Sequence, residues 1–312
     1  MIAAVWLPLL LPFLAGPVGP RLVSRLPPRQ AAWLLTVTAA GLAAASTTAL
    51  ALLVVPGATH LHAVAALGRL LTPLATGSPD TVVTVAAVMA LTLLLLCTAL
   101  LVRGLHRRWA QSARAKRLAG RTAGELLVLP DETADAYALP GRPGRIVVTA
   151  GMLRALSAAE REALLAHERA HLRGRHHRFT AVMELSALCH PALGTLREPL
   201  AYALERCADE DAARAVGDRR LTARAIGKAA LAARHAGRRP GPALAATAGP
   251  VPRRVAALLE ERAEVAGSGR TAGAVIASAL LACLALSTAS ALEAAGDLHT
   301  SIEVAQGERP EP

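Results

Sequence analysis

The segment His167-Glu168-Arg169-Ala170-His171 combines two imidazoles and a carboxylate at a spacing that suits a metal site. In a helix, positions i and i+4 lie on one face, one turn apart, so both histidines can reach the same metal ion. Glu168 lies beside the pair and can take a proton from a metal-bound water without being a ligand. The pattern indicates a hydrolytic zinc site; for these residues alone, the alternative is a solvated face of an Ala-, Glu- and Arg-rich helix.

The residues before this segment predict the helix that it needs. Ser157 followed by Glu160 forms the sequence of a capping box, which predicts a helix beginning near Ala158. Ala, Leu, Glu and Arg occupy most of the positions that follow, and all four are strong helix formers. The two histidines are therefore expected on one regular helix.

A catalytic zinc ion usually has three protein ligands and a water, so a third ligand is needed. The stretch from His167 to His177 reads H-E-x-x-H-x-x-G-x-x-H, the metzincin pattern, in which Gly174 would make a turn and His177 would be the ligand. Metzincins also need a later Met-turn, and Met183 follows too closely in a helical run. This argues against the metzincin pattern, but His177 stays open as a candidate.

Glu205, on a later predicted helix, is the other candidate. Asp209 is at position i+4 from it, on the same helix face, and can accept the outer N–H of a zinc-bound histidine. Two helices that each offer such a pair arise by chance less often than one. We favour Glu205 and interpret His176 and His177 as polar residues at a helix end near the membrane.

The composition indicates a membrane protein. The chain has 312 residues, of which 53% are hydrophobic and only 2% aromatic, and its mean hydropathy is +0.39. The formal net charge is +11, and nearly all the cations are Arg, since Lys occurs only at 116 and 228. Binding to nucleic acid is one interpretation of this charge. We favour contact with the anionic inner surface of a lipid bilayer, because the arginines flank apolar runs and no aromatic stacking platform accompanies them.

Four apolar runs are predicted to span the membrane: residues 2–19, 31–55, 81–102 and 271–292. Arginines cluster in 21–29 and 103–121, which places these flanks in the cytoplasm. The protein would then lie in the plasma membrane. Its N-terminus, the loop 56–80 and an acidic, disordered tail over 293–312 would be extracytoplasmic. A hairpin or interfacial segment is the alternative for the first run.

These boundaries divide the chain into a three-span region with a basic flank (1–121), a cytoplasmic domain (122–270), a fourth span (271–292) and the tail (293–312). In the domain we expect strands over 124–129, 134–139 and 145–149, a buried or membrane-abutting helix over 178–196 and a helix over 198–216. The last strand either binds an extended peptide at its edge or only supports the helix. The predicted fold is a mainly α membrane protein with an α+β zinc protease domain between spans three and four.

The chain resembles the membrane-embedded gluzincin metallopeptidases. The H-E-x-x-H of His167, an apolar helix and the E-x-x-x-D of Glu205 are similar to those of the BlaR/MecR sensor-transducers (M56-like peptidases) and, more distantly, of HtpX-type proteases. The resemblance implies that His167, His171 and Glu205 bind one Zn²⁺ ion. It also implies that Glu168 is the general base and that Asp209 supports a ligand histidine.

Two departures from these families matter. Only residues 293–312 follow the last span, where the sensor-transducers carry a penicillin-binding domain, so sensing of beta-lactams is not expected. The His-Pro of HtpX-type enzymes is missing from Pro250–Val255. The group that stabilises the oxyanion is therefore open, with Tyr202, His190 and Arg254 as candidates.

The expected function is hydrolysis of peptide bonds at the inner membrane face. By resemblance, the substrate is a cytoplasmic or membrane-proximal protein, such as a winged-helix transcriptional repressor in a signalling pathway. Quality control of membrane proteins, as by HtpX-type proteases, is the second expectation. A zinc-binding membrane signalling protein without turnover is the third.

Overall fold

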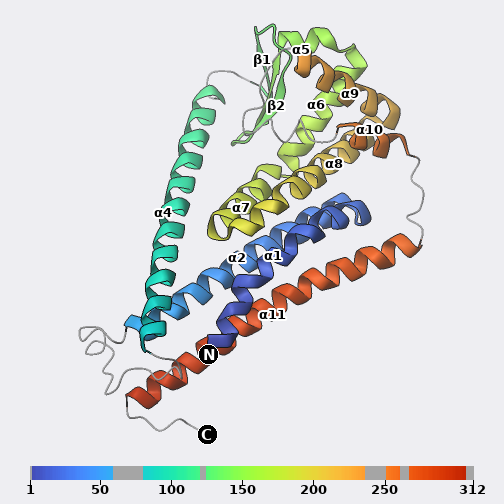
Figure 1. The fold of residues 1–312 in the computed structure, drawn as a ribbon. Coiled ribbons are helices and arrows are strands. Elements are labelled where there is room, and N and C mark those ends of the chain that lie inside the picture. The colour runs from blue at the N-terminus through green and yellow to red at the C-terminus, as the bar shows by residue number, and fades with distance from the viewer. Residues whose placement is uncertain (1, 59–79, 120–123, 236–250, 261–266, 307–312) are drawn as a thin grey trace.

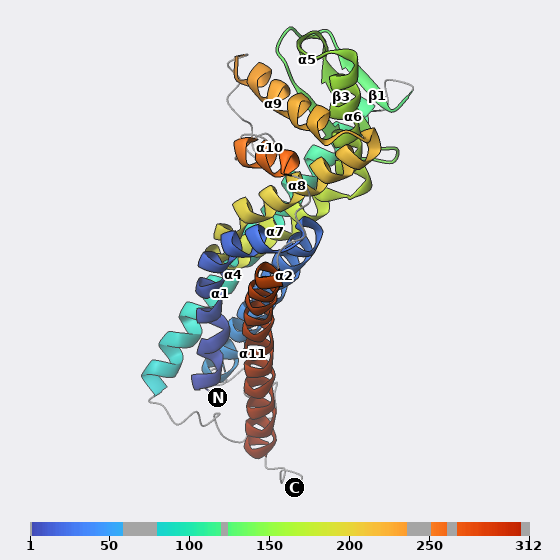
Figure 2. The same ribbon diagram turned by 90° about the vertical axis from the view of Figure 1, so that its right-hand side faces the viewer.

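The computed structural model describes residues 2–58, 80–119, 124–235, 251–260 and 267–306 (Figure 1). It is mainly helical, with one small sheet. Four long helices are sufficiently long and apolar to cross a membrane: α1 (Ile2–Arg25), α2 (Pro28–Ala58), α4 (Asp80–Ala119) and α11 (Gly267–Ala305). Figure 2 shows the sheet and the shorter helices at one end of the molecule, from which the long helices extend. These features fit the predicted membrane protein.

The first apolar run forms one continuous helix, although α1 contains four prolines. A proline inside a helix leaves the carbonyl four residues before it without its donor. Pro12 has this effect on the carbonyl of Pro8, and the hydroxyl of Ser46 on α2 donates to that oxygen at 2.7 Å. Contact between the two helices therefore satisfies the backbone group that the proline frees, as an apolar surrounding requires.

The fourth long helix corrects the prediction of a disordered tail over 293–312 for residues 293–305. Residues 307–312 lie outside the described part of the chain. The helix α11 continues through residue 292 to Ala305. Buried Ala294 packs against Val5 and Ala49, and Leu298 packs against Leu52 of α2. The apolar stripe of α11 thus keeps a neighbour beyond the predicted end, which favours continued helix. The loop 56–80 lies mostly outside the described residues.

A bent pair of helices joins the long helices to the sheet end of the molecule. The predicted helix over 178–196 is α7 (His176–Cys189) followed by the 3₁₀ turn η1 (Pro191–Leu196), and α8 (Arg197–Val216) comes next. One core of buried residues joins α1, α2 and α11 to this pair, and it includes Leu35, Met183 and Leu200. The segment 178–196, predicted as a buried or membrane-abutting helix, thus packs on the long helices, because α7 and α8 share their core with them.

The sheet contains β1 (Leu126–Leu129), β2 (Ala136–Leu139) and β3 (Arg145–Thr149), close to the predicted strands. The order is β1-β3-β2, with β3 parallel to β1 and antiparallel to β2. All five residues of β3 are buried. The idea that Arg145–Thr149 offers an edge to a peptide is therefore wrong, because both sides of this strand are already paired.

The shorter helices complete this end of the molecule: α5 (Ala150–Ala155), α6 (Ala158–Arg173), α9 (Arg219–His235) and α10 (Val251–Leu259). The predicted start of α6 is confirmed, since Ser157 and Glu160 form the full capping box. The carboxylate of Glu160 also lies 2.7 Å from the ammonium of Lys228 on α9. The cap and this ion pair fix the N-terminal end of α6 against α9.

Candidate metal centre

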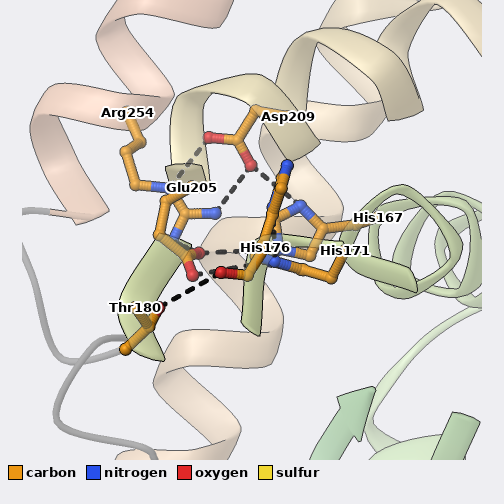
Figure 3. A network of polar contacts seen from close by, with 7 residues as sticks. All are labelled: His167, His171, His176, Thr180, Glu205, Asp209 and Arg254. Carbon is orange, nitrogen blue, oxygen red and sulfur yellow. Dashed lines mark hydrogen bonds and ion pairs between the residues drawn. The ribbon is translucent and has the colours of Figure 1, made fainter. Parts of the chain in front are cut away.

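Three ligand atoms from two helices converge on one point beside α6. His167 and His171 project from one face of α6, and Glu205 projects toward them from α8 (Figure 3). The Nε2 atoms of the two histidines are 3.1 Å apart. The carboxylate of Glu205 lies 3.5 Å from each of these two nitrogens. The structure thus brings the favoured third ligand to the histidine pair.

These distances fit a tetrahedral zinc ion. Ligand atoms at roughly 2.0–2.1 Å from a tetrahedral zinc lie about 3.3–3.4 Å from one another. The two Nε2 atoms are 3.1 Å apart, and they lie 3.5 Å from different oxygens of the Glu205 carboxylate, Oε2 for His167 and Oε1 for His171. Two imidazoles and a carboxylate are also a donor set that zinc accepts at catalytic sites. The residues present therefore fit the ion.

A carboxylate and a guanidinium surround the outer side of this group. Asp209 is fully buried and lies with Oδ1 3.0 Å from Nδ1 of His167. Arg254 of α10 contacts both oxygens of Asp209, through Nε at 2.8 Å and Nη2 at 2.6 Å. Its Nη1 atom lies 2.7 Å from Oε2 of Glu205. Arg254 therefore holds the two carboxylates of α8 in place, with its donors turned toward them.

The pKa values of these groups follow from their mutual charges. Burial by itself lowers the pKa of His167, but hydrogen bonds and charge from Asp209 and Glu205 raise it to about 10. Burial lowers the pKa of His171 to about 3. Burial by itself raises the pKa of Glu205, but Arg254 and the histidines hold it below its ordinary value. Burial also opposes ionisation of Asp209, but hydrogen bonds from Arg254 and His167 lower its pKa. Both α8 carboxylates are therefore ionised at neutral pH, as metal binding requires of the ligand Glu205.

Glu168 is buried on α6 beside the ligand pair. Burial raises the pKa of its carboxyl group to about 7, with an added contribution from the charge of Glu205. The backbone N–H of Ala138 on β2 donates to it and acts in the opposite direction. A carboxyl group with this pKa can accept and release a proton near neutral pH, which suits a general acid–base.

The sequence interpretation did not predict that His176 contacts the ligand candidate His171. Its Nδ1 atom lies 2.8 Å from Nδ1 of His171, and its side chain is buried. His177, the metzincin candidate, is exposed on α7 and is not brought to the ligand group. The chain leaves α6 at Gly174 and passes through Arg175 in the left-handed region, with φ 50°. This turn changes the helical phase, so that the first of the two histidines points back to the site.

Tyr202 and His190, the two candidates for oxyanion stabilisation besides Arg254, lie in different parts of the structure. Tyr202 lies on α8, one turn before Glu205, with the guanidinium of Arg253 4.9 Å from its ring centroid. His190 follows α7, at the opposite end of that helix from His176. Its Nε2 atom lies 3.1 Å from the carbonyl oxygen of Leu9 on α1. His190 therefore links η1 to the first long helix and is not brought to the ligand group.

The fold and this group define a class of protein: two histidines of one helix, a glutamate of a second and a buried glutamate beside them form the donor set of a metal-dependent hydrolase on a scaffold of long apolar helices. The model of Peptidase family M48 matches residues 99–196, which is less than half of the 312-residue chain. The matched stretch includes His167, Glu168 and His171 and supports a membrane-type zinc metallopeptidase. Comparison with curated proteins and comparison with solved structures each gave no match.

Proposed function

We propose that the protein is a zinc-dependent endopeptidase of the cell membrane. The observation that supports this most strongly is the group of His167, His171 and Glu205, whose possible ligand atoms all lie within 4.8 Å of one another. Buried Glu168 stands beside it in the position of a general base. The match to Peptidase family M48 agrees with this chemistry.

In the proposed mechanism, His167, His171 and Glu205 hold the ion, and Asp209 fixes the ring of His167. When bound, zinc acidifies a water and polarises the carbonyl group of the substrate. Glu168 takes the proton from the attacking water and delivers a proton to the leaving amine. The N–H donors of Arg254 are occupied by the carboxylates of Asp209 and Glu205. Tyr202 of α8, whose ring contacts Arg253, is therefore the remaining candidate for a hydrogen-bond donor to the oxyanion.

The edge of β2 is the proposed place for an extended substrate. Thr149 donates to the carbonyl of Asp135 across the β3–β2 pair, so the backbone groups of residues 136 and 138 face away from β3. One of these, the N–H of Ala138, points to Glu168. A peptide that paired with this edge would run beside the general base.

The substrate is proposed to be a cytoplasmic or membrane-proximal protein. The positive flanks of the apolar helices favour a cytoplasmic site, and the helix that carries Glu205 shares its core with α1 and α2. A transcriptional repressor in a signalling pathway is one substrate class. Damaged membrane proteins are the other, and the placement of α7 and α8 directly on the long helices favours it.

The test compares the full-length protein with Glu168→Gln, in detergent and in cells. Glu168→Gln should keep bound zinc and lose peptide hydrolysis by at least about 100-fold, the usual effect of losing a general base. Glu162→Gln is the matched control, because this glutamate is exposed on the same helix. Zinc is measured by elemental analysis, and cleavage by mass spectrometry of new protein termini.

Each outcome separates the alternatives. New termini in the repressor would support signalling, and termini in misfolded membrane proteins would support quality control. Hydrolysis retained by Glu168→Gln would remove Glu168 from its role. Zinc binding with equal termini in wild type and Glu168→Gln would favour a signalling protein without turnover.

A further inference from the structure

We propose that His176 is a positioning residue that fixes the tautomer and ring orientation of His171 for metal binding. The inference rests on the metal site of the proposed function but not on peptide hydrolysis. It starts from the two nitrogens of His171, which face different groups (Figure 3). Nε2 faces His167 and Glu205, whereas Nδ1 faces His176 at 2.8 Å.

The chemistry of the imidazole ring fixes the hydrogen positions. A histidine that binds a metal through Nε2 is neutral and carries its proton on Nδ1. His171 must then donate this proton to Nδ1 of His176, which must present a lone pair and carry its own proton on Nε2. A histidine ligand normally has such an acceptor on its outer nitrogen, which orients the ring and supports its basicity.

The arrangement repeats what Asp209 does for the other ligand. The outer nitrogen of His167 faces a carboxylate at 3.0 Å, and that of His171 faces a neutral ring at 2.8 Å. The planes of His171 and His176 are nearly perpendicular, at 89°. Each ligand histidine of α6 therefore has its own partner, one from α8 and one from α7.

The turn between α6 and α7 is built around this ring. A Cβ atom added at Gly174 would overlap Nε2 and Cδ2 of His176. The φ of Gly174 is −72°, which any residue adopts, so a glycine is favoured here by the lack of space and not by the backbone conformation. The ring of His176 is the main obstacle, and the carbonyl oxygen of Ala170 would also lie 3.1 Å from the added atom. Arg175 accepts the less favourable left-handed conformation, with φ 50°, and so starts α7 in the phase that buries the ring.

The experiment measures metal affinity directly, by competition for Zn²⁺ and by the visible absorption of bound Co²⁺, in the full-length protein. His176→Leu should lower the affinity by about 10- to 100-fold, as loss of such a partner does. His176→Asn keeps an acceptor at the δ position and should restore most of it. His176→Gln moves the acceptor to the ε position and should not. His177→Leu, at an exposed neighbouring position, is the control and should leave the affinity unchanged.

A double-mutant cycle tests the role of the glycine. Gly174→Ala should weaken metal binding and change the Co²⁺ spectrum in the wild-type background. It should have little further effect when His176 is already Ala, because no ring remains to be displaced.

The outcomes are distinguishable from failure of the proposed function. Wild-type protein without metal affinity would overturn the metal site and this inference together. Wild-type affinity that persists in His176→Leu, or equal losses in His176→Asn and His176→Gln, would overturn the inference alone. The comparison of Asn with Gln decides even if the Leu variant fails to fold.

Discussion

Arg254 is the only positive side chain of α10 that the structure buries among the carboxylates of α8, and its removal makes the sharpest stability prediction. Its side chain is 5% exposed, and those of Glu205 and Asp209 are 7% and 0% exposed. All three contacts of its guanidinium with these carboxylates are between 2.6 and 2.8 Å. Arg254→Met keeps the apolar stem and removes the charge.

The magnitude follows from the charges that remain. His167, with its pKa raised to about 10, can offset one of the two carboxylates. His171 cannot offset the other, because burial lowers its pKa to about 3. One buried negative charge is thus left without a partner, which costs about 3–5 kcal/mol of unfolding free energy. At about 2 °C per kcal/mol for a chain of this size, the melting temperature falls by about 6–10 °C.

The assay is thermal unfolding in detergent, followed by helical circular dichroism, with a chelator and again with excess zinc. Arg253→Met is the matched control, since this neighbouring arginine is exposed and only covers the ring of Tyr202. Its loss should cost at most about 1 kcal/mol. Zinc should reduce the deficit of Arg254→Met, because the cation replaces a positive charge beside Glu205 and stabilises the folded state that binds it.

Equal melting temperatures for the two arginine variants would refute this reasoning. A deficit in Arg254→Met that zinc leaves unchanged would refute the part that concerns the metal. The first result would mean that the carboxylates of α8 do not depend on Arg254 for their positive partner. The second would mean that a bound zinc ion does not replace its charge.

Three other predictions follow from single contacts. Glu205→Ala should lower the zinc content of the purified protein, whereas His177→Ala should leave it unchanged; the reverse result would favour the metzincin-type site. Lys228→Met should lower the melting temperature at pH 7. The pKa of Glu160 is held at about 2, mainly by its hydrogen bond with Lys228, so the difference from wild type should shrink as the pH falls from about 4.5 toward 2, and a constant difference would contradict this cause. Ser46→Ala should cost about 1 kcal/mol in detergent, because a buried carbonyl of α1 loses its donor; unchanged unfolding would show that this carbonyl has another partner.

Local patterns were sufficient for the elements of the site. The capping box at Ser157 and the spacing of His167 and His171 lie within one helix, where positions along the chain fix positions in space. The same holds for Glu205 and Asp209 on α8. Long apolar runs likewise predicted the four long helices, because their length and composition are themselves the signal.

Contacts between distant parts of the chain needed the tertiary structure. Arg254 is 45 positions from Asp209, and nothing in its neighbourhood distinguishes it from the exposed Arg253. The strand Arg145–Thr149 has the composition of an edge or a central strand, and only pairing on both sides makes it central. The helix α11 extends past residue 292 because α1 and α2 offer it a surface there.

The neighbouring residues His176 and His177 show the difference between what the sequence predicts and what only the tertiary structure decides. The sequence by itself predicted that two histidines of α6 and a carboxylate of α8 form a candidate metal site, in a chain whose long helices are apolar enough to cross a membrane. Only the tertiary structure decided which neighbouring histidine joins it, because a single left-handed residue, Arg175, sets the rotation of α7 about its axis. A shift of one residue along a helix rotates the side chain by about 100° about the helix axis. The spacing of residues in the sequence therefore cannot predict which of the two histidines faces the site, because that depends on the path of the backbone through this turn.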